Sequence, residues 1–132
     1  MCKLFIGADP ALWSMRTKSL RIDGVATSIR IEEFFWSVLD EIGARDGMTV
    51  NQLITRLHLE ALDADHDMGN FTSFLRVCCG RYLALISAGQ ISGALTDSLR
   101  DVQADAILPR ETALRHARVA QIERMPRRTL AH

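Results

Sequence analysis

The 132-residue chain has few of the residues that mark disordered or cross-linked proteins. Three prolines and eight glycines are too few for a low-complexity chain, and 48% apolar residues can supply a hydrophobic core. Its three cysteines are an odd number and two of them are adjacent, which does not fit a disulfide framework. We therefore expect reduced thiols and a cytoplasmic protein with one modest domain plus extensions.

Long apolar runs and catalytic motifs are also missing. No run approaches the roughly 20 residues that a membrane-spanning helix needs, and Asp9 and Pro10 interrupt the apolar start before a signal peptide can form. The sequence has no glycine-rich phosphate loop, nucleophile elbow or convincing pair of catalytic carboxylates. These absences predict a protein that is not an enzyme, needs no cofactor and does not enter a membrane.

The candidate metal ligands do not complete a known pattern. Three aspartates within residues 63–67 resemble a calcium loop, but Met68 replaces its glycine and Phe74 its closing glutamate. We expect no bound metal, because no standard zinc spacing is found among the remaining candidates His58, His66, Cys78 and Cys79.

The net charge of zero argues against a uniformly basic nucleic-acid binder, but the charges are unevenly distributed. Residues 1–31 contain five basic and two acidic side chains, whereas residues 32–67 contain two basic and nine acidic ones. This asymmetry suits a protein that presents one small positive surface to phosphates.

Residues 25–31 are β-branched and alternate in polarity, which predicts a half-buried strand. Thr27, Ile29 and Ile31 would face the core, and Gly24 precedes the strand. The opposite, outward face would be formed by Ala26, Ser28 and Arg30.

Two helices are predicted after the strand. Glu32 and Glu33 place negative charge at the start of the first helix, and Thr49 and Gln52 form a capping box that starts the second. We expect the core, which two copies of the chain would share, to contain Thr27, Ile29, Ile31, Phe35, Trp36, Leu39, Leu53, Ile54 and Leu57.

The flanking segments are less regular. Residues 1–17 indicate an arm in which Leu4, Phe5 and Ile6 form a short strand or a hydrophobic anchor. Asn70 would cap a third helix that ends near Ser87 and completes a domain over residues 18–88. Residues 89–132 would form a helical extension with a basic tail. In that extension we expect one helix over residues 91–108, a break at Pro109 and a second helix over residues 111–124.

A single strand followed by two helices leaves a row of backbone hydrogen-bonding groups without partners. No second strand is evident close to residues 25–31, so we expect two copies to pair their strands antiparallel in a mainly α-helical homodimer. The resulting two-stranded ribbon would fit the major groove of double-stranded DNA. Arg30 and Ser28 would then bond to base edges, and Ala26 would make an apolar contact.

Other residues would contact the DNA backbone. The backbone N–H groups at the start of the second helix, at Thr49, Val50 and Asn51, would hold a phosphate. Lys18 and Arg21 would reach flanking phosphates, although ordinary solvated charge explains them nearly as well.

The stretch T-S-I-R-I-E-E-F-F-W-S-V-L-D-E-I-G-A-R-D-G-M-T-V-N-Q-L-I, residues 27–54, resembles the ribbon-helix-helix superfamily of small bacterial repressors and antitoxins. More closely, S-L-R-I-x-G-x-x-T-S-I-R-I-E and N-x-x-S-x-L-R-V resemble a subgroup with a further helix. The resemblance implies an obligate dimer, operator binding and repression, with Ala26, Ser28 and Arg30 at the base-reading positions.

A different function is also open. The ribbon would serve to dimerise, while the third helix and residues 111–128 bind a protein partner, as the extension of an antitoxin binds its toxin. The acidic middle of the chain and the apolar Ala26 favour this adaptor-like alternative.

Overall fold

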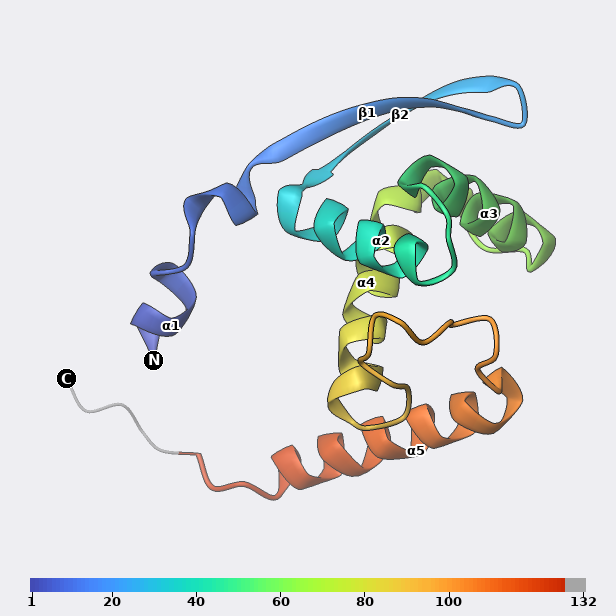
Figure 1. Cartoon of the computed structure of the whole chain (residues 1–132). Coiled ribbons are helices and arrows are strands. Elements are labelled where there is room, and N and C mark those ends of the chain that lie inside the picture. The colour runs from blue at the N-terminus through green and yellow to red at the C-terminus, as the bar shows by residue number, and fades with distance from the viewer. Residues whose placement is uncertain (128–132) are drawn as a thin grey trace.

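The computed structural model describes residues 1–127. Within them a β-hairpin lies on a group of three helices, a fourth long helix lies on the far side, and a short helix projects from the N-terminus (Figure 1). The α-helices and strands are α1 (Cys2–Ile6), β1 (Met15–Ile22), β2 (Val25–Glu32), α2 (Glu33–Arg45), α3 (Val50–Asp63), α4 (Phe71–Ser87) and α5 (Ala104–Glu123), and the two 3-10 turns are η1 (Pro10–Trp13) and η2 (Met68–Asn70).

The predicted strand is not alone. β1 pairs antiparallel with β2 along its whole length, from Met15 opposite Glu32 to Ile22 opposite Val25. Asp23 and Gly24 connect them with φ angles of 52° and 78°, the two positive values that a tight hairpin turn requires. The expectation that β2 has no second strand nearby is therefore wrong, and pairing with another copy is not needed to satisfy this edge of β2.

The hairpin buries one face and exposes the other. Leu20, Ile22, Ile29 and Ile31 are buried on the side toward the helices, where they join the main hydrophobic core. Neighbouring residues along each strand are exposed or half-buried, which gives the period of two that the sequence of β2 predicted. In β1 the alternation is present only from Lys18 to Ile22.

The predicted helices after the strand are confirmed as α2 and α3. Thr49 Oγ1 accepts from the Gln52 N–H, and Gln52 Oε1 accepts from the Thr49 N–H, so the capping box is complete. The third predicted helix is confirmed as α4, although the Asn70 side chain makes no capping bond. Cys79 is the fully buried thiol of α4, and Cys78 is half-buried.

The expected helix over residues 91–108 is wrong. Residues 91–103 contain no helix and are held to the end of α2 by polar contacts. The Arg45 side chain, only 6% exposed, donates to the Asp97 carbonyl at 2.9 Å, and Asp46 accepts from the Leu99 N–H at 3.0 Å. These hydrogen bonds hold residues 91–103 as an ordered loop against the end of α2 instead of a helix.

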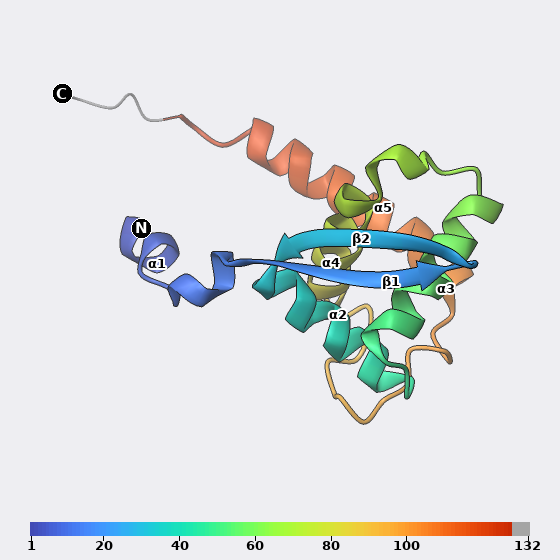
Figure 2. The same ribbon diagram turned by 90° about the horizontal axis from the view of Figure 1, so that it is seen from above.

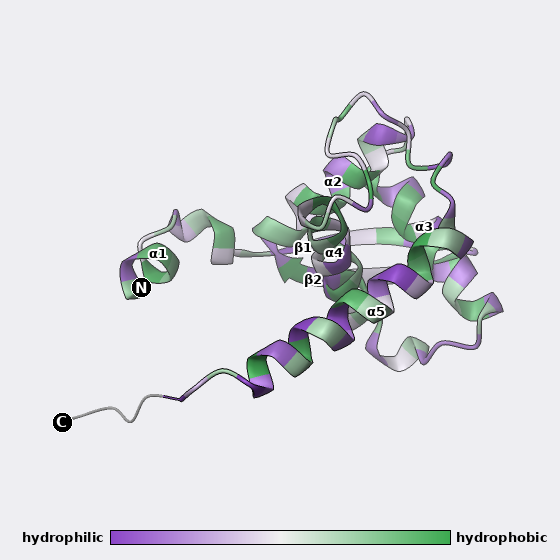
Figure 3. Ribbon diagram, turned by 90° about the horizontal axis from the view of Figure 1, so that it is seen from below, coloured by the Kyte–Doolittle hydropathy of each residue, from purple (hydrophilic) through white to green (hydrophobic). Residues whose placement is uncertain are grey.

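The expected break at Pro109 is also wrong, because α5 continues through it. A proline removes one N–H from a helix interior, and here the remaining turns carry on to Glu123. No side chain of α5 is buried, and polar and apolar residues alternate along it (Figure 3). The predicted basic tail lies partly outside the described residues, which end at Arg127.

The N-terminal arm expected over residues 1–17 begins with a short helix and a 3-10 turn, its residues 4–6 are helical and not a strand, and its residues 15–17 belong to β1. α1 projects away from the body of the molecule (Figure 1), η1 contacts α2, and Leu4, Phe5, Ile6 and Trp13 are exposed. Within residues 1–127, no helix combines the length and apolar character needed to cross a membrane.

Candidate nucleic-acid interface

The outward face of the hairpin is the most distinctive polar surface of the fold. Viewed from above, no other described element lies in front of the two strands (Figure 2). Because directly opposed residues of an antiparallel pair point to the same side, β1 and β2 contribute equally to this face. We call these six exposed residues the ribbon face: Thr17, Ser19, Arg21, Ala26, Ser28 and Arg30.

The three residues proposed from the sequence to read bases therefore lie together on the ribbon face. Ala26 is opposite Arg21, Ser28 is opposite Ser19, and the two serine hydroxyl oxygens are 3.4 Å apart. Arg30 has no hydrogen bond or ion pair within the described part of the chain, so its five N–H donors are available to a ligand.

Sequence reasoning missed the half of the ribbon face that β1 supplies. A signal was present, because Asp-Gly between two alternating segments is a strong indication of a two-residue hairpin. The segment before Asp23 alternates only at Leu20 and Ile22, and its first half is too polar to stand out.

Lys18 and Arg21, both expected at phosphates, lie on opposite faces of β1. Arg21 lies on the ribbon face, where its Nη1 donates to the Gly24 carbonyl at 3.3 Å. The Lys18 amine instead lies 5.4 Å from the centre of the Trp36 ring, on the side toward α2. The structure thus separates two cations that the sequence grouped together.

Trp36 fixes the open end of the hairpin to α2. Its side chain is 1% exposed, and Nε1 donates to the Arg16 carbonyl at 2.9 Å. The Arg16 guanidinium lies 5.5 Å from the same ring and forms an ion pair with Glu33 at 2.5 Å. The Glu33 N–H also donates to the Ser14 carbonyl at 2.8 Å, so the start of β1 is attached to the first turn of α2.

Glu32 attaches the end of β2 to α4. Its carboxylate accepts two hydrogen bonds from Arg76, at 2.6 and 3.2 Å. These bonds lower the pKa of Glu32 below its ordinary value, and burial opposes the shift. Both strands are therefore held against helices at the open end of the hairpin, away from the Asp23–Gly24 turn, which presents the ribbon face on a rigid base.

α3 contacts β1, and its first turn carries free backbone donors. The capping box satisfies the N–H groups of Thr49 and Gln52, which leaves those of Val50 and Asn51 without partners in the described structure. Free N–H groups at the positive end of a helix dipole are suited to an anion. The Val50 side chain is buried, so only its backbone is available.

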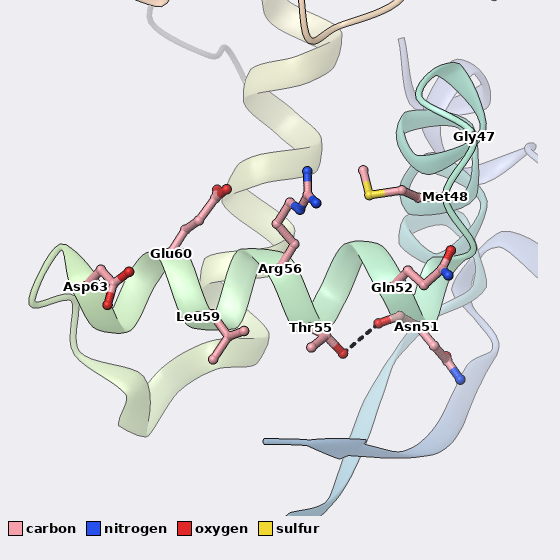
Figure 4. A pocket seen from close by; sticks show the side chains of 9 residues that line it. All are labelled: Gly47, Met48, Asn51, Gln52, Thr55, Arg56, Leu59, Glu60 and Asp63. Atoms are coloured by element: carbon pink, nitrogen blue, oxygen red, sulfur yellow. Dashed lines mark hydrogen bonds between the residues drawn. The ribbon is translucent and has the colours of Figure 1, made fainter. Parts of the chain in front are cut away.

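A pocket of about 640 Å³ follows the exposed side of α3. Figure 4 shows Asn51 at one end, where its carbonyl accepts from Thr55 Oγ1 at 2.8 Å, and Asp63 at the other. Glu60 adds a second carboxylate to the far end. Because carboxylates repel phosphate, an anion site on α3 is confined to the end that contains Asn51.

The apolar residues expected in a dimer core lie in the core of one chain. Ile29, Ile31, Trp36, Leu39, Leu53 and Ile54 are buried there. Phe35 and Leu57 pack against it and are half-buried. Thr27 is also half-buried and donates to the Val25 carbonyl at 3.3 Å.

The described residues contain no group of three or more His, Cys, Asp or Glu side chains that could hold a metal ion. His58 and His66 instead lie against Phe71 and Phe74, with ring centres 5.0 and 5.5 Å apart. Burial raises the pKa of Cys79 to about 12, so that thiol is inert at neutral pH.

A sequence profile of the ribbon-helix-helix domain matches residues 15–83, just over half of the chain. The chain belongs to the ribbon-helix-helix family. Ribbon-helix-helix proteins generally bind DNA as dimers, which agrees with an exposed, cationic strand face. The matched residues begin with β1, so the hairpin is part of the family domain.

A solved structure also resembles this ribbon-helix-helix protein. It is that of an uncharacterized protein from Bordetella pertussis Tohama I, which is 50% identical in sequence, with a TM-score of 0.78. The similarity covers 81% of this chain and 86% of that one, and therefore extends beyond residues 15–83. No protein with a curated description matches the chain.

Proposed function

We propose that this ribbon-helix-helix protein is a sequence-specific DNA-binding regulator that represses transcription by occupying its operator. It would act in the cytoplasm, at the nucleoid. The observation that carries the proposal is the ribbon face, a two-stranded surface with two arginines and two serines held rigidly on the helices. A two-stranded ribbon has the width that the major groove admits.

The residues on this face match the chemistry of base edges. A guanidinium can donate to both N7 and O6 of guanine, which suits Arg30. The hydroxyl of Ser28 can donate or accept with several bases, and the methyl group of Ala26 can contact a thymine methyl. None of the three is needed to hold the fold, because all are exposed.

Phosphate contacts would orient the ribbon without reading sequence. The free N–H groups of Val50 and Asn51, with the Thr49 cap, would bind a phosphate beside the groove. Lys18, on the inner face of β1, would reach a phosphate only if its side chain left the Trp36 ring and passed the edge of the strand. An acidic α2 beneath the hairpin would confine binding to this one side.

The protein would act as a homodimer. Monomeric proteins rarely leave large apolar surfaces uncovered, and α1 and α5 expose many apolar side chains. A second copy covering them would bring two ribbons to two half-sites. The exposed apolar residues are Leu4, Phe5, Ile6 and Trp13 in the arm and Leu108, Leu114, Val119 and Ile122 in α5.

The test is selection of binding sites from a random DNA library, followed by mobility shifts with Arg30→Ala. Arg124→Ala removes the same charge at the distant end of α5 and serves as the matched control. We expect the wild type and the control to enrich one sequence motif, and Arg30→Ala to bind that motif about tenfold or more weakly. Equal binding by all three proteins would sink the ribbon mechanism.

A second function is favoured by α5, in which no side chain is buried. In that case the apolar residues of α5 cover a protein partner, as in an antitoxin or adaptor, and the hairpin domain serves mainly to dimerise. A stoichiometric partner that co-purifies with the wild type but not with a Leu114→Ser/Ile122→Ser variant would support it. Enrichment of an operator by the isolated protein would favour the regulator instead.

A further inference from the structure

The two strands of the hairpin carry nearly the same five residues. Residues 19–23 are S-L-R-I-D and residues 28–32 are S-I-R-I-E, nine positions later. Serine, arginine and isoleucine are identical, and the two remaining positions exchange leucine for isoleucine and aspartate for glutamate. The way the two strands pair gives this short repeat a structural role.

The pairing register places the two copies of the repeat around a local twofold axis. Ser19 lies directly opposite Ser28, and in an antiparallel pair such an axis passes between two facing residues. Each residue that follows Ser19 is then related to the residue the same distance after Ser28. Arg21 corresponds to Arg30, and both lie on the ribbon face.

The buried side repeats in the same way. Leu20 corresponds to Ile29 and Ile22 to Ile31, and all four side chains are buried beneath the strands. The hairpin is therefore symmetric in what it packs as well as in what it exposes. One chain reproduces in itself a ribbon that two identical strands would form.

We propose that the hairpin of a single chain is a complete, pseudo-symmetric DNA-reading ribbon in which Arg21 and Arg30 are equivalent base readers. This inference rests on the proposed DNA-binding function and changes the role of Arg21 from phosphate contact to base contact. Both arginines lie on the outward face, which would point to the floor of the groove. Phosphates would flank the ribbon, on the side where α3 contacts β1.

The geometry specifies the kind of site. Arg21 is opposite Ala26, which is four residues from Arg30 along β2, a separation of about 14 Å. At roughly 3.4 Å for each base pair, the two arginines would reach positions about four base pairs apart. Because a twofold axis relates them, their guanines would lie on opposite DNA strands as a short inverted repeat.

The symmetry is incomplete, and the differences are informative. Thr17, opposite Arg30, corresponds to Ala26, opposite Arg21, so the flanks of the site would differ in polarity. Arg21 Nη1 also bonds to the Gly24 carbonyl at 3.3 Å, whereas Arg30 has no such partner in the described structure. The long bond leaves the other guanidinium donors of Arg21 free.

The experiment compares the motifs that wild type, Arg21→Ala and Arg30→Ala select from a random DNA library. We expect each half-site of the wild-type motif to contain two guanines related by an inverted repeat. Each variant should lose about tenfold or more preference at one guanine and keep it at the other. Unchanged urea midpoints would confirm that both variants are folded.

A second substitution separates base contact from phosphate contact. Arg21→Lys retains the charge but loses the two-pronged geometry that guanine requires. We expect it to lose the base preference while the salt dependence of binding stays unchanged. A phosphate contact would behave oppositely, because Arg21→Ala would weaken binding to all sequences alike and lower the salt slope by about one.

The outcomes distinguish this inference from the function on which it rests. A wild-type motif with one arginine-dependent guanine, lost only in Arg30→Ala, would overturn the pseudo-symmetric ribbon and leave the regulator proposal standing. A uniform loss of affinity in Arg21→Ala would do the same. Failure of the wild type to enrich any sequence would instead refute the proposed function itself.

Discussion

Replacing Trp36 tests how the hairpin is held on the helices. Trp36→Phe shrinks the ring of a side chain that is 1% exposed, which costs about 1.5 kcal/mol in lost burial and packing. It also leaves the Arg16 carbonyl without its 2.9 Å donor, which costs about another 1 kcal/mol. We therefore expect the free energy of unfolding to fall by about 2–3 kcal/mol.

Trp13→Phe is the matched control, because it makes the same chemical change in a side chain that is 54% exposed. Its effect should stay within about 0.5 kcal/mol. Urea unfolding followed by far-ultraviolet circular dichroism measures both variants. Equal losses in the two, or a loss below about 1 kcal/mol for Trp36→Phe, would refute the view that Trp36 anchors β1 to α2.

Three further predictions concern the turn, an ion pair and the thiols. Gly24→Ala should destabilise the protein by about 1 kcal/mol, because the φ angle of Gly24 is 78°. Gly80→Ala, in the open middle of α4, should stabilise the protein by up to about 1 kcal/mol. Urea unfolding measures both variants. The hydrogen bonds from Arg76 lower the pKa of Glu32 in the folded protein. The pair therefore stabilises the fold fully at pH values above the ordinary carboxyl pKa. This stabilisation is lost as the pH falls through the lowered pKa of Glu32. The difference in urea midpoint between wild type and Arg76→Gln should therefore shrink from pH 6 to pH 3, and a constant difference would contradict this account. In the native protein at pH 8, iodoacetamide should modify the exposed Cys2 first and the buried Cys79 last, as read by peptide mass spectrometry; early modification of Cys79 would show that its site opens.

The sequence predicted the elements whose hydrophobic period is strong. Residues 25–31 alternate cleanly, and the capping box at Thr49 marks the start of α3 without help from tertiary contacts. The outward position of Ser28 and Arg30 followed directly, because period two leaves no other choice once Ile29 and Ile31 are buried.

β1 and the C-terminal segments were missed for a different reason. Arg16 and Lys18 occupy inward positions of β1, and their stems and charges lie over Trp36 in place of apolar side chains. That arrangement hides the strand from a search for alternation. Residues 91–103 are fixed by Arg45 and Asp46, which lie about fifty positions earlier, and no local pattern reveals such bonds.

The pairing of β1 with β2 changes how a DNA-reading ribbon could form. With β2 believed to be single, a reading ribbon required two copies of the chain. With β1 beside it, one chain has six outward residues, and the proposed homodimer rests instead on the exposed apolar side chains of the N-terminal arm and α5. Ribbon formation and dimerisation thus become separable properties.

The most direct measurement replaces the guanines of the selected site by 7-deazaguanine, which lacks the N7 acceptor in the major groove. We predict that each replacement weakens wild-type binding about fivefold to tenfold, since one of two arginine bonds is lost. Replacing the guanine that Arg30 contacts should not weaken the binding of the Arg30→Ala variant any further, because that variant has already lost the contact. Binding that is insensitive to every replacement, or losses that simply multiply with Arg30→Ala, would contradict the claim that the ribbon face reads DNA.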